Sequence, residues 1–301
     1  MGRKPRGTKT VEFTHPTAAE KRYARQLKKV ADHINGIVDF YGLNEDARDR
    51  ALREYTIHLA PWARVAAAQM LQDVSKTNLR AWSSASRALG AGLRATTTTG
   101  PTAQAMTVLH AQNVEAILKM PSDAVSMIAK MKREGAADLI RKMEERSRAA
   151  MASGVRSETL AKQLLPEARE SLIRQYGEQA QEKLSSQLAS RSRLIARTET
   201  ARANATLTQV RGVGIGATSY VWRGMLDAAE RQTHVAMEGQ VINYDDPPDP
   251  EGDGNHYHAG QTYNCRCTQE IILPSDEPFD RNSAGEQAYQ EAARRDQDLQ
   301  E

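Results

Sequence analysis

Long helical stretches fill the first two thirds of the chain and restrict its fold more than any other feature. From Thr17 to about Val210 the sequence is rich in Ala, Arg, Glu and Gln, and apolar residues recur near helical spacing. Such helices bury narrow apolar stripes and expose long charged faces. We expect the helices to be interrupted by the polar segment 93–102 and by three prolines, Pro61, Pro121 and Pro166.

The character of the sequence changes at Gly212, where short β-prone pieces alternate with Gly and Pro. The stretches TSYVWRG, GQVINY and CTQEIIL predict three strands. The stretch DAAERQTHVAME predicts a short helix that begins at Asp227 and ends at Gly239. The acidic segment DDPPDPEGDGN predicts an irregular loop. Together these pieces indicate a small α+β unit.

We therefore predict a mainly α protein: a long helical N-terminal region followed by a small α+β C-terminal unit. No run of 18 apolar residues is present, so no membrane span is expected. The predicted division is a basic flexible arm at 1–16, a helical region at 17–100, a helical array at 101–211, the α+β unit at 212–274 and a polar helical tail at 275–301.

Positive charge is concentrated at the N-terminus. Residues 1–30 carry a net charge of +7, which exceeds the +3 of the whole chain. This pattern makes the arm a candidate for contacts with nucleic acid, although a short charged tail is more often only solvated. The candidate residues in the arm are Arg3, Lys4, Arg6 and Lys9.

Both cysteines of the chain lie in one C-x-C, at Cys265 and Cys267. Two cysteines this close together are poorly placed to form a disulfide with each other. Cysteine and histidine are the usual zinc ligands, and two of His234, His256 and His258 could complete a site with the two sulfurs. Alternatively, the cysteines begin a strand and one is buried as a small hydrophobic side chain. The spacing alone leaves both possibilities open.

A catalytic interpretation of the same region has less support from the sequence than a structural metal site. His256 and His258 could form a divalent-metal hydrolase site with the acidic residues nearby, which are Asp245, Asp246, Asp249 and Asp253. Nothing in the sequence supplies a positioned nucleophile or a pair of oxyanion donors, so we predict that the protein is not an enzyme.

Three sequence blocks, in this order and spacing, resemble a known family. They are LIARTETARANA (194–205), YVWRGMLDAAERQTHVAMEGQ (220–240) and NCRC (264–267). The set is similar to the phage Mu F-like head-morphogenesis family, the minor head proteins of tailed phages. The chain departs from the family in the second block, where Arg231 lies four residues after Asp227 and Gln232 precedes Thr233. The matching positions are Arg197, Thr198, Glu199, Trp222, Asp227, Arg231, Thr233, His234, Gly239 and Asn264 to Cys267.

The resemblance implies a minor capsid protein of the virion that is bound to the portal vertex inside the head. It implies roles in head assembly and in DNA packaging or ejection, after assembly in the host cytoplasm. The expected partner is the portal protein, with major capsid or scaffold protein and double-stranded phage DNA as further candidates. The alternatives are a DNA-binding ejection protein and, less favoured, a metal-dependent nuclease or effector delivered with the genome.

The resemblance also implies a fixed local arrangement around the cysteines. It favours a structural zinc site formed by His234, Cys265 and Cys267, with His258 as the fourth ligand and His256 as its alternate. If no metal binds, we expect a buried polar network that joins the helical array to the sheet. Its members would be Arg197, Glu199, Asp227 and Arg231.

Overall fold

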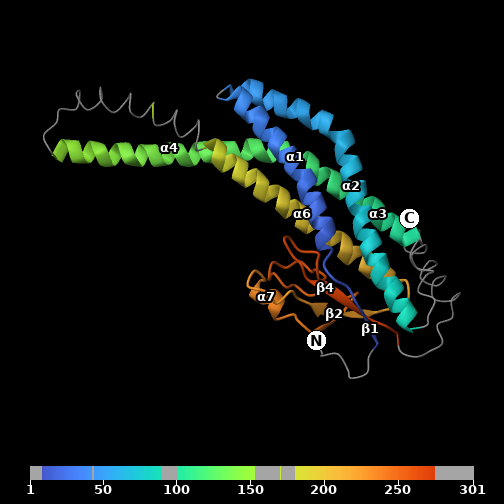
Figure 1. The fold of residues 1–301 in the computed structure, drawn as a ribbon. Coiled ribbons are helices and arrows are strands. Elements are labelled where there is room, and N and C mark those ends of the chain that lie inside the picture. Colours follow the sequence, from blue (N-terminus) through green and yellow to red (C-terminus); the bar gives the residue numbers. More distant parts are fainter. Residues whose placement is uncertain (1–8, 43, 90–99, 153–169, 171–179, 275–301) are drawn as a thin grey trace, which may run out of the picture. The chain divides into compact units, whose positions relative to one another are not determined.

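The computed structural model describes residues 9–42, 44–89, 100–152, 170 and 180–274 (Figure 1). The predicted linker at 93–102 lies mostly outside these residues, and the predicted tail at 275–301 lies entirely outside them. None of the described helices combines the length and the apolar character needed to cross a bilayer.

Helices dominate the described residues, as predicted. The long helices are α1 (Thr17–Tyr41), α2 (Glu45–Leu89), α3 (Gly100–Leu118), α4 (Met120–Ala152) and α6 (Ala180–Val213), and α7 (Gln232–Val235) is a single short turn. The predicted short helix from Asp227 to Gly239 is therefore much shorter than expected. Asp227 instead accepts a hydrogen bond from the backbone N–H of Ala229, in a turn that precedes α7.

The prediction that a helix ends before Pro61 is wrong, because α2 continues through this proline. Proline removes one backbone hydrogen bond, the one that would reach the carbonyl of Ile57. Ile57 is 72% exposed, so water can hydrate the carbonyl that is left without a partner. Packing on both sides of Pro61, where Leu59 and Ala63 are buried, keeps the helix continuous.

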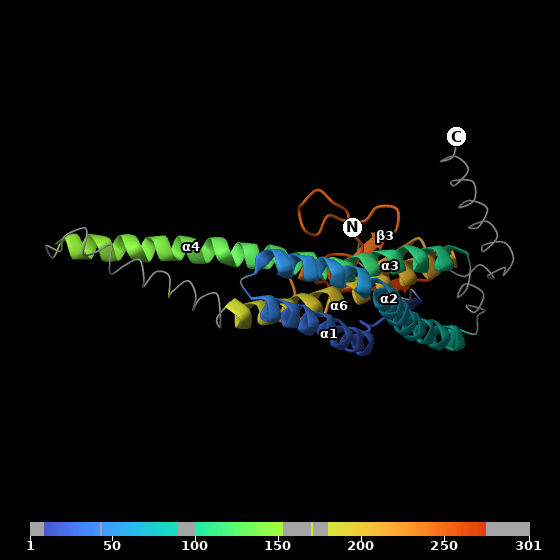
Figure 2. The ribbon, with the colours of Figure 1, turned by 90° about the horizontal axis from the view of Figure 1, so that it is seen from above.

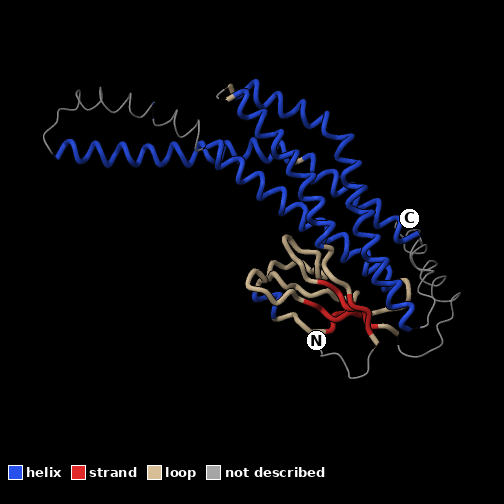
Figure 3. Tube along the Cα trace, viewed as in Figure 1, coloured by secondary structure: helices blue, strands red, loops and turns tan. Residues whose placement is uncertain are grey.

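The strands form one four-stranded antiparallel sheet with the order β1-β4-β2-β3 (red in Figure 3). The strands are β1 (Thr10–Glu12), β2 (Ser219–Arg223), β3 (Val241–Asn243) and β4 (Thr268–Ile272). The three strands predicted after Gly212 are present. In the central pair, Tyr220 of β2 lies opposite Ile271 of β4.

The fourth strand, β1, comes from the segment that was predicted to be a flexible arm. Val11 pairs with Ile271, and the N–H of Leu273 donates to the carbonyl of Lys9. Val11 and Phe13 are buried on alternate positions, which is the period of a strand. The prediction of flexibility is wrong for residues 10–12, because two buried apolar side chains outweigh the basic composition of the segment.

The chain forms two compact units, each assembled from separate segments of sequence. Unit 1 comprises residues 1–25, 63–115 and 194–301, and unit 2 comprises 26–62 and 116–193. Each unit thus combines segments that lie far apart in the sequence. The linear division with boundaries after residues 16, 100, 211 and 274 stays a prediction.

Unit 1 holds the sheet and its core. Trp82 of α2 packs against Phe13, with ring centroids 5.2 Å apart. The core also takes in both cysteines. Its buried members are Val11, Phe13, Trp82, Ile215, Ala217, Tyr220, Trp222, Met237, Ile242, Tyr244, Ala259, Cys265, Cys267 and Ile271.

Unit 2 is entirely helical in its described residues. Ring stacking between His33 and Tyr55, at a centroid distance of 4.3 Å, connects α1 and α2, and an ion pair between Arg191 and Asp123 connects α6 and α4 at 2.9 Å. The end of α4 toward Ala152 extends past the other described helices of this unit (Figure 2).

Candidate metal centre

His234, Cys265 and Cys267 come together inside unit 1. His234 lies on α7, whose N-cap is Arg231, and Cys267 immediately precedes β4. The three side chains are 2%, 3% and 4% exposed, and their ligand atoms lie within 4.8 Å of one another. The structure therefore unites the three residues that the sequence analysis ranked first for a metal.

The geometry of the three ligand atoms fits zinc. The Nδ1 atom of His234 lies 3.4 Å from Cys267 Sγ and 3.6 Å from Cys265 Sγ. Zinc bonds sulfur at about 2.3 Å and nitrogen at about 2.0 Å, so tetrahedral angles separate such ligands by roughly 3.6 Å. The two nitrogen-to-sulfur distances are thus near those that one tetrahedral ion requires.

The second ring nitrogen of His234 binds a carboxylate. Nε2 lies 2.9 Å from Glu251 Oε1, and Arg231 forms an ion pair with the same oxygen at 2.6 Å. Histidines that bind metals usually donate their other N–H to a carboxylate or carbonyl, which fixes the ring orientation and the tautomer. Glu251 is placed for this role, and Arg231 holds it there.

A second carboxylate approaches the cluster from the turn before α7. The Cys267 thiol donates to Glu230 Oε1 at 3.2 Å. The other oxygen of Glu230 accepts the N–H of Leu226 at 2.5 Å. Glu230 therefore faces the cluster with one oxygen, while the backbone holds the other.

The two thiols differ in their proton affinity. Hydrogen bonds from Cys267 and His234 lower the pKa of Cys265, against the opposing effect of burial. The pKa of Cys267 is raised by its hydrogen bond with Cys265, by burial and by Glu230. Burial alone would lower the pKa of His234, but Cys265 and Glu251 raise it overall. The hydrogen bonds from Cys267 and His234 therefore favour the thiolate of Cys265, and the thiolate is the form that binds metals.

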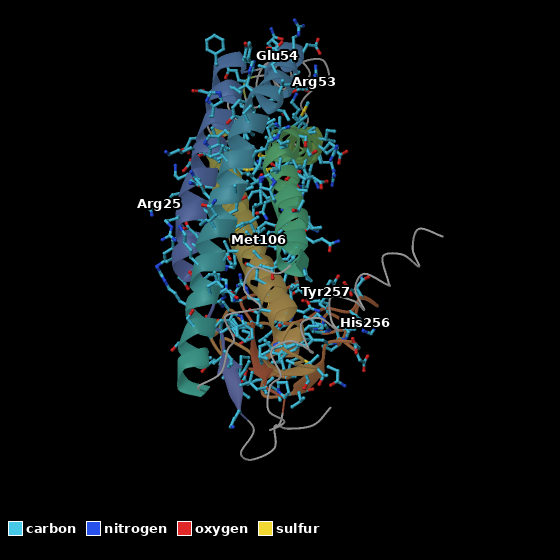
Figure 4. All side chains as sticks on the ribbon, turned by 90° about the vertical axis from the view of Figure 1, so that its right-hand side faces the viewer. Arg25, Arg53, Glu54, Met106, His256 and Tyr257 are labelled. Carbon is cyan, nitrogen blue, oxygen red and sulfur yellow. The ribbon has the colours of Figure 1, made fainter. Side chains whose placement is uncertain are left out.

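His258 and His256 lie elsewhere. His258 is buried, with Nδ1 3.3 Å from the Tyr220 hydroxyl and its ring 5.6 Å from that of Tyr244. Its ring packs against these tyrosines, and its nitrogens are not among the ligand atoms that cluster at the cysteines. His256 is exposed on the loop shown in Figure 4, and its Nδ1 bonds the carbonyl of Pro247 at 2.6 Å. The structure does not bring either histidine to the cysteines.

The acidic loop is organised by its own backbone. Asp249 accepts hydrogen bonds from the N–H groups of Gly252, Asp253 and Gly254. These bonds occupy one of the four carboxylates that the hydrolase interpretation would assign to a metal.

The four residues predicted to form one polar network bond to separate partners. Arg197 pairs with Glu20 at 3.2 Å, and Asp227 pairs with Arg266 at 2.6 Å. Glu199 pairs with Arg202, and Arg231 with Glu251. None of the four bonds to another of the four.

The first and third sequence blocks nevertheless touch. Thr198 Oγ1 accepts the N–H of Asn264 at 3.0 Å, and Arg197 donates to the Asn264 side chain at 3.2 Å. Asn264 has a positive φ of 58°, which asparagine tolerates better than most residues. Helix α6 thereby fixes the turn that presents Cys265 and Cys267.

Comparison with known proteins gives a family for this part of the chain. The model of the family described as Phage Mu protein F like protein matches residues 141–270, a little under half of the chain. This segment is similar to the Phage Mu protein F family. It contains α6, the candidate metal centre, strands β2 and β3 and the first part of β4.

A Haemophilus influenzae protein (strain Rd), described as uncharacterized, is 36% identical over 93 residues. The match covers 31% of this chain and 20% of that protein, so the chain spans about a fifth of the length of this relative. No solved structure matches the chain.

Two residues at the candidate metal centre, Glu230 and Glu251, were not predicted from the sequence. Glu230 lies four residues before His234, a spacing that was visible in DAAERQTH. Glu251 lies in the acidic loop, and no local signal distinguishes it from its solvated neighbours. Of the candidate nucleic-acid residues, only Lys9 lies within the described part of the chain, and it is exposed.

Proposed function

We propose that the protein is a minor head protein of a tailed bacteriophage, bound at the portal vertex inside the head. In this role it acts in head morphogenesis and in DNA packaging or ejection. The observation that carries the proposal is the Mu F-like match over residues 141–270, since that family is related to phage heads. The portal protein is the proposed partner, with major capsid or scaffold protein as additional contacts, and assembly takes place in the host cytoplasm.

Reconstitution of procapsids tests this proposal. The chain is co-expressed with the portal, scaffold and major capsid proteins of its own phage, and procapsids are purified with and without the portal. We expect the chain in procapsids that contain the portal and its loss when the portal is omitted. Absence from complete procapsids, or equal incorporation without the portal, would contradict the proposal.

We also propose that His234, Cys265 and Cys267 hold one structural zinc ion. The supporting observation is that the three ligand atoms lie within 4.8 Å of one another, with nitrogen-to-sulfur distances of 3.4 and 3.6 Å that suit a tetrahedral ion. A bound ion would connect α7 to the segment before β4 and so stabilise this side of unit 1. The ion would have a structural role there. Its binding free energy would contribute directly to the free energy of folding.

A second candidate function is binding of double-stranded DNA during ejection, favoured by the net charge of +7 on residues 1–30. Deleting the whole segment is a poor test, because β1 belongs to the sheet. Replacing Arg3, Lys4, Arg6 and Lys9 by Ala leaves the strand in place. We expect this variant to bind duplex DNA more weakly and with a shallower salt dependence, measured by fluorescence anisotropy. Unchanged affinity and salt dependence would rule out this role for the arm.

A further inference from the structure

We propose that Glu230 is the fourth ligand of the metal site, in the place that the sequence analysis assigned to His258. The inference rests on the proposed zinc site and goes one step further, because it decides whether the site is closed or open. Structural zinc sites use four protein ligands, whereas catalytic sites keep one position for water or substrate.

The first support is the position of one carboxylate oxygen. Glu230 Oε1 lies 3.2 Å from Cys267 Sγ. Oxygen and sulfur ligands of one tetrahedral zinc ion stand roughly 3.5 Å apart, from bond lengths of about 2.1 and 2.3 Å. The oxygen contacts Cys267 but lies outside the group of ligand atoms within 4.8 Å of one another, so the glutamate side chain would have to rotate to reach the ion. His256 and His258 bond elsewhere, whereas Glu230 contacts one of the two sulfur ligands directly.

The second support is a backbone shaped around the Glu230 carboxylate. A Cβ atom at Gly224 would lie 2.5 Å from Oε1 and 2.9 Å from Oε2 of Glu230. The glycine thus leaves the space that the carboxylate fills. Leu226 donates its N–H to Oε2 although its own φ is 54°, an unfavourable value for leucine. The loop accepts this conformation while holding one oxygen and leaving the other directed at Cys267.

The third support is that the two carboxylates contact different atoms of the cluster. Glu251 contacts His234 at Nε2, on the side of the ring away from the sulfurs. It is therefore a positioning residue and not a ligand. Glu230 contacts a sulfur ligand directly, on the side where an ion would bind. One carboxylate orients the histidine, and the other contacts a sulfur ligand and would complete the coordination.

The test measures zinc affinity of the full-length protein by competition with a chromophoric chelator. The informative variants are Glu230→Ala, which removes the ligand, and Gly224→Ala, which keeps Glu230 but crowds its carboxylate. The matched control is Glu54→Ala, since Glu54 is an exposed glutamate on α2 (Figure 4). Circular dichroism checks that each variant is folded.

We expect Glu230→Ala to weaken zinc binding by more than about 100-fold, beyond the range seen for partners that only support a ligand. Gly224→Ala should weaken it in the same direction, and Glu54→Ala should match the wild type. If Glu230→Ala does not fold, the zinc affinity of Gly224→Ala alone is the test.

Cobalt(II) substitution gives a second readout, because the visible spectrum of the ion reports its coordination. With Glu230 as a ligand, added azide should leave the wild-type spectrum unchanged and alter that of Glu230→Ala, whose fourth position is open. Wild-type zinc affinity in both variants, or an azide response in the wild-type protein, would overturn the role of Glu230 and leave the three-ligand site standing. No zinc binding by the wild type would overturn both proposals.

Discussion

Glu199, in the first Mu F-like block, is a buried carboxyl group with one oxygen that lacks a hydrogen-bond partner. Burial raises its pKa above the ordinary 4.5, although Arg202 opposes the shift. A carboxyl group with a raised folded-state pKa contributes stability below its unfolded pKa. That contribution is lost as the pH rises through the folded value.

The variant Glu199→Gln tests this consequence, because glutamine is neutral at every pH. We expect its free energy of unfolding to exceed that of the wild type at neutral pH. The difference should disappear below pH 4.5, where the wild-type carboxyl is protonated. Urea denaturation at the two pH values measures this, and an equal effect of the substitution at both would contradict it.

Glu251 offers a second test at the level of a single residue. Glu251→Gln keeps the shape of the side chain but weakens the charge-assisted bond to His234 Nε2. We expect zinc affinity to fall by about 10- to 100-fold, as for other partners that orient a metal-bound histidine. Thermal stability of the zinc-free protein should change little. Equal losses with and without zinc would mean that Glu251 acts only through general stability.

Among the structural elements, the loop before β4 depends on one close approach to helix α6. Gly260 has φ +87°, and a Cβ there would lie 2.9 Å from the carbonyl oxygen of Cys267 and 3.1 Å from the Ala205 side chain. Gly260→Ala should therefore lower the free energy of unfolding by more than about 1 kcal/mol. Chemical denaturation measures the change.

Gly36 is the matched control, because it lies inside α1 and a Cβ there would meet nothing within 4 Å. Alanine is favoured over glycine in a helix interior, so Gly36→Ala should stabilise the protein by about 1 kcal/mol. Opposite signs for the two substitutions are the expected result. If both substitutions change the free energy of unfolding in the same direction, the loop can accommodate a side chain at position 260.

The elements that could be predicted from sequence are those with a long or repeated local signal. The helical region that begins at Thr17 and the three strands after Gly212 were predictable in this way. Strand β1 was not, because three residues cannot establish an alternation and its pairing with β4 is a contact across the whole sequence. The path of α2 through Pro61 depends on tertiary packing, which outweighs a local helix-breaking signal.

The residues of the candidate site also differ in whether the sequence could predict them. The C-x-C and His234 were visible as residue types, and chemistry alone made them candidates. Glu251 reaches His234 from a loop whose position is set by packing, so no sequence pattern pointed to it. His258 has the right residue type, but its ring packs against Tyr220 and Tyr244.

At the scale of the molecule, unit 1 joins the two ends of the described chain. Strand β1 begins at residue 10, and its partner β4 ends at residue 272. Deleting residues 1–12 removes β1, whereas deleting residues 1–8 retains it. We expect the longer deletion to lower stability by about 2 kcal/mol or more, since burying one valine contributes that much. Thermal unfolding compares the two, and identical melting temperatures would contradict a structural role for β1.

In the proposed role, the Mu F-like segment holds one structural metal ion between α7 and the segment before β4. The most direct measurement is the metal content of purified protein by plasma mass spectrometry, for the wild type and for Cys265→Ser/Cys267→Ser. We expect about one zinc ion per chain in the wild type, and loss of both the zinc and thermal stability in the double variant. Wild-type protein without metal would contradict the claim, and the two cysteines would then be packing residues of the core.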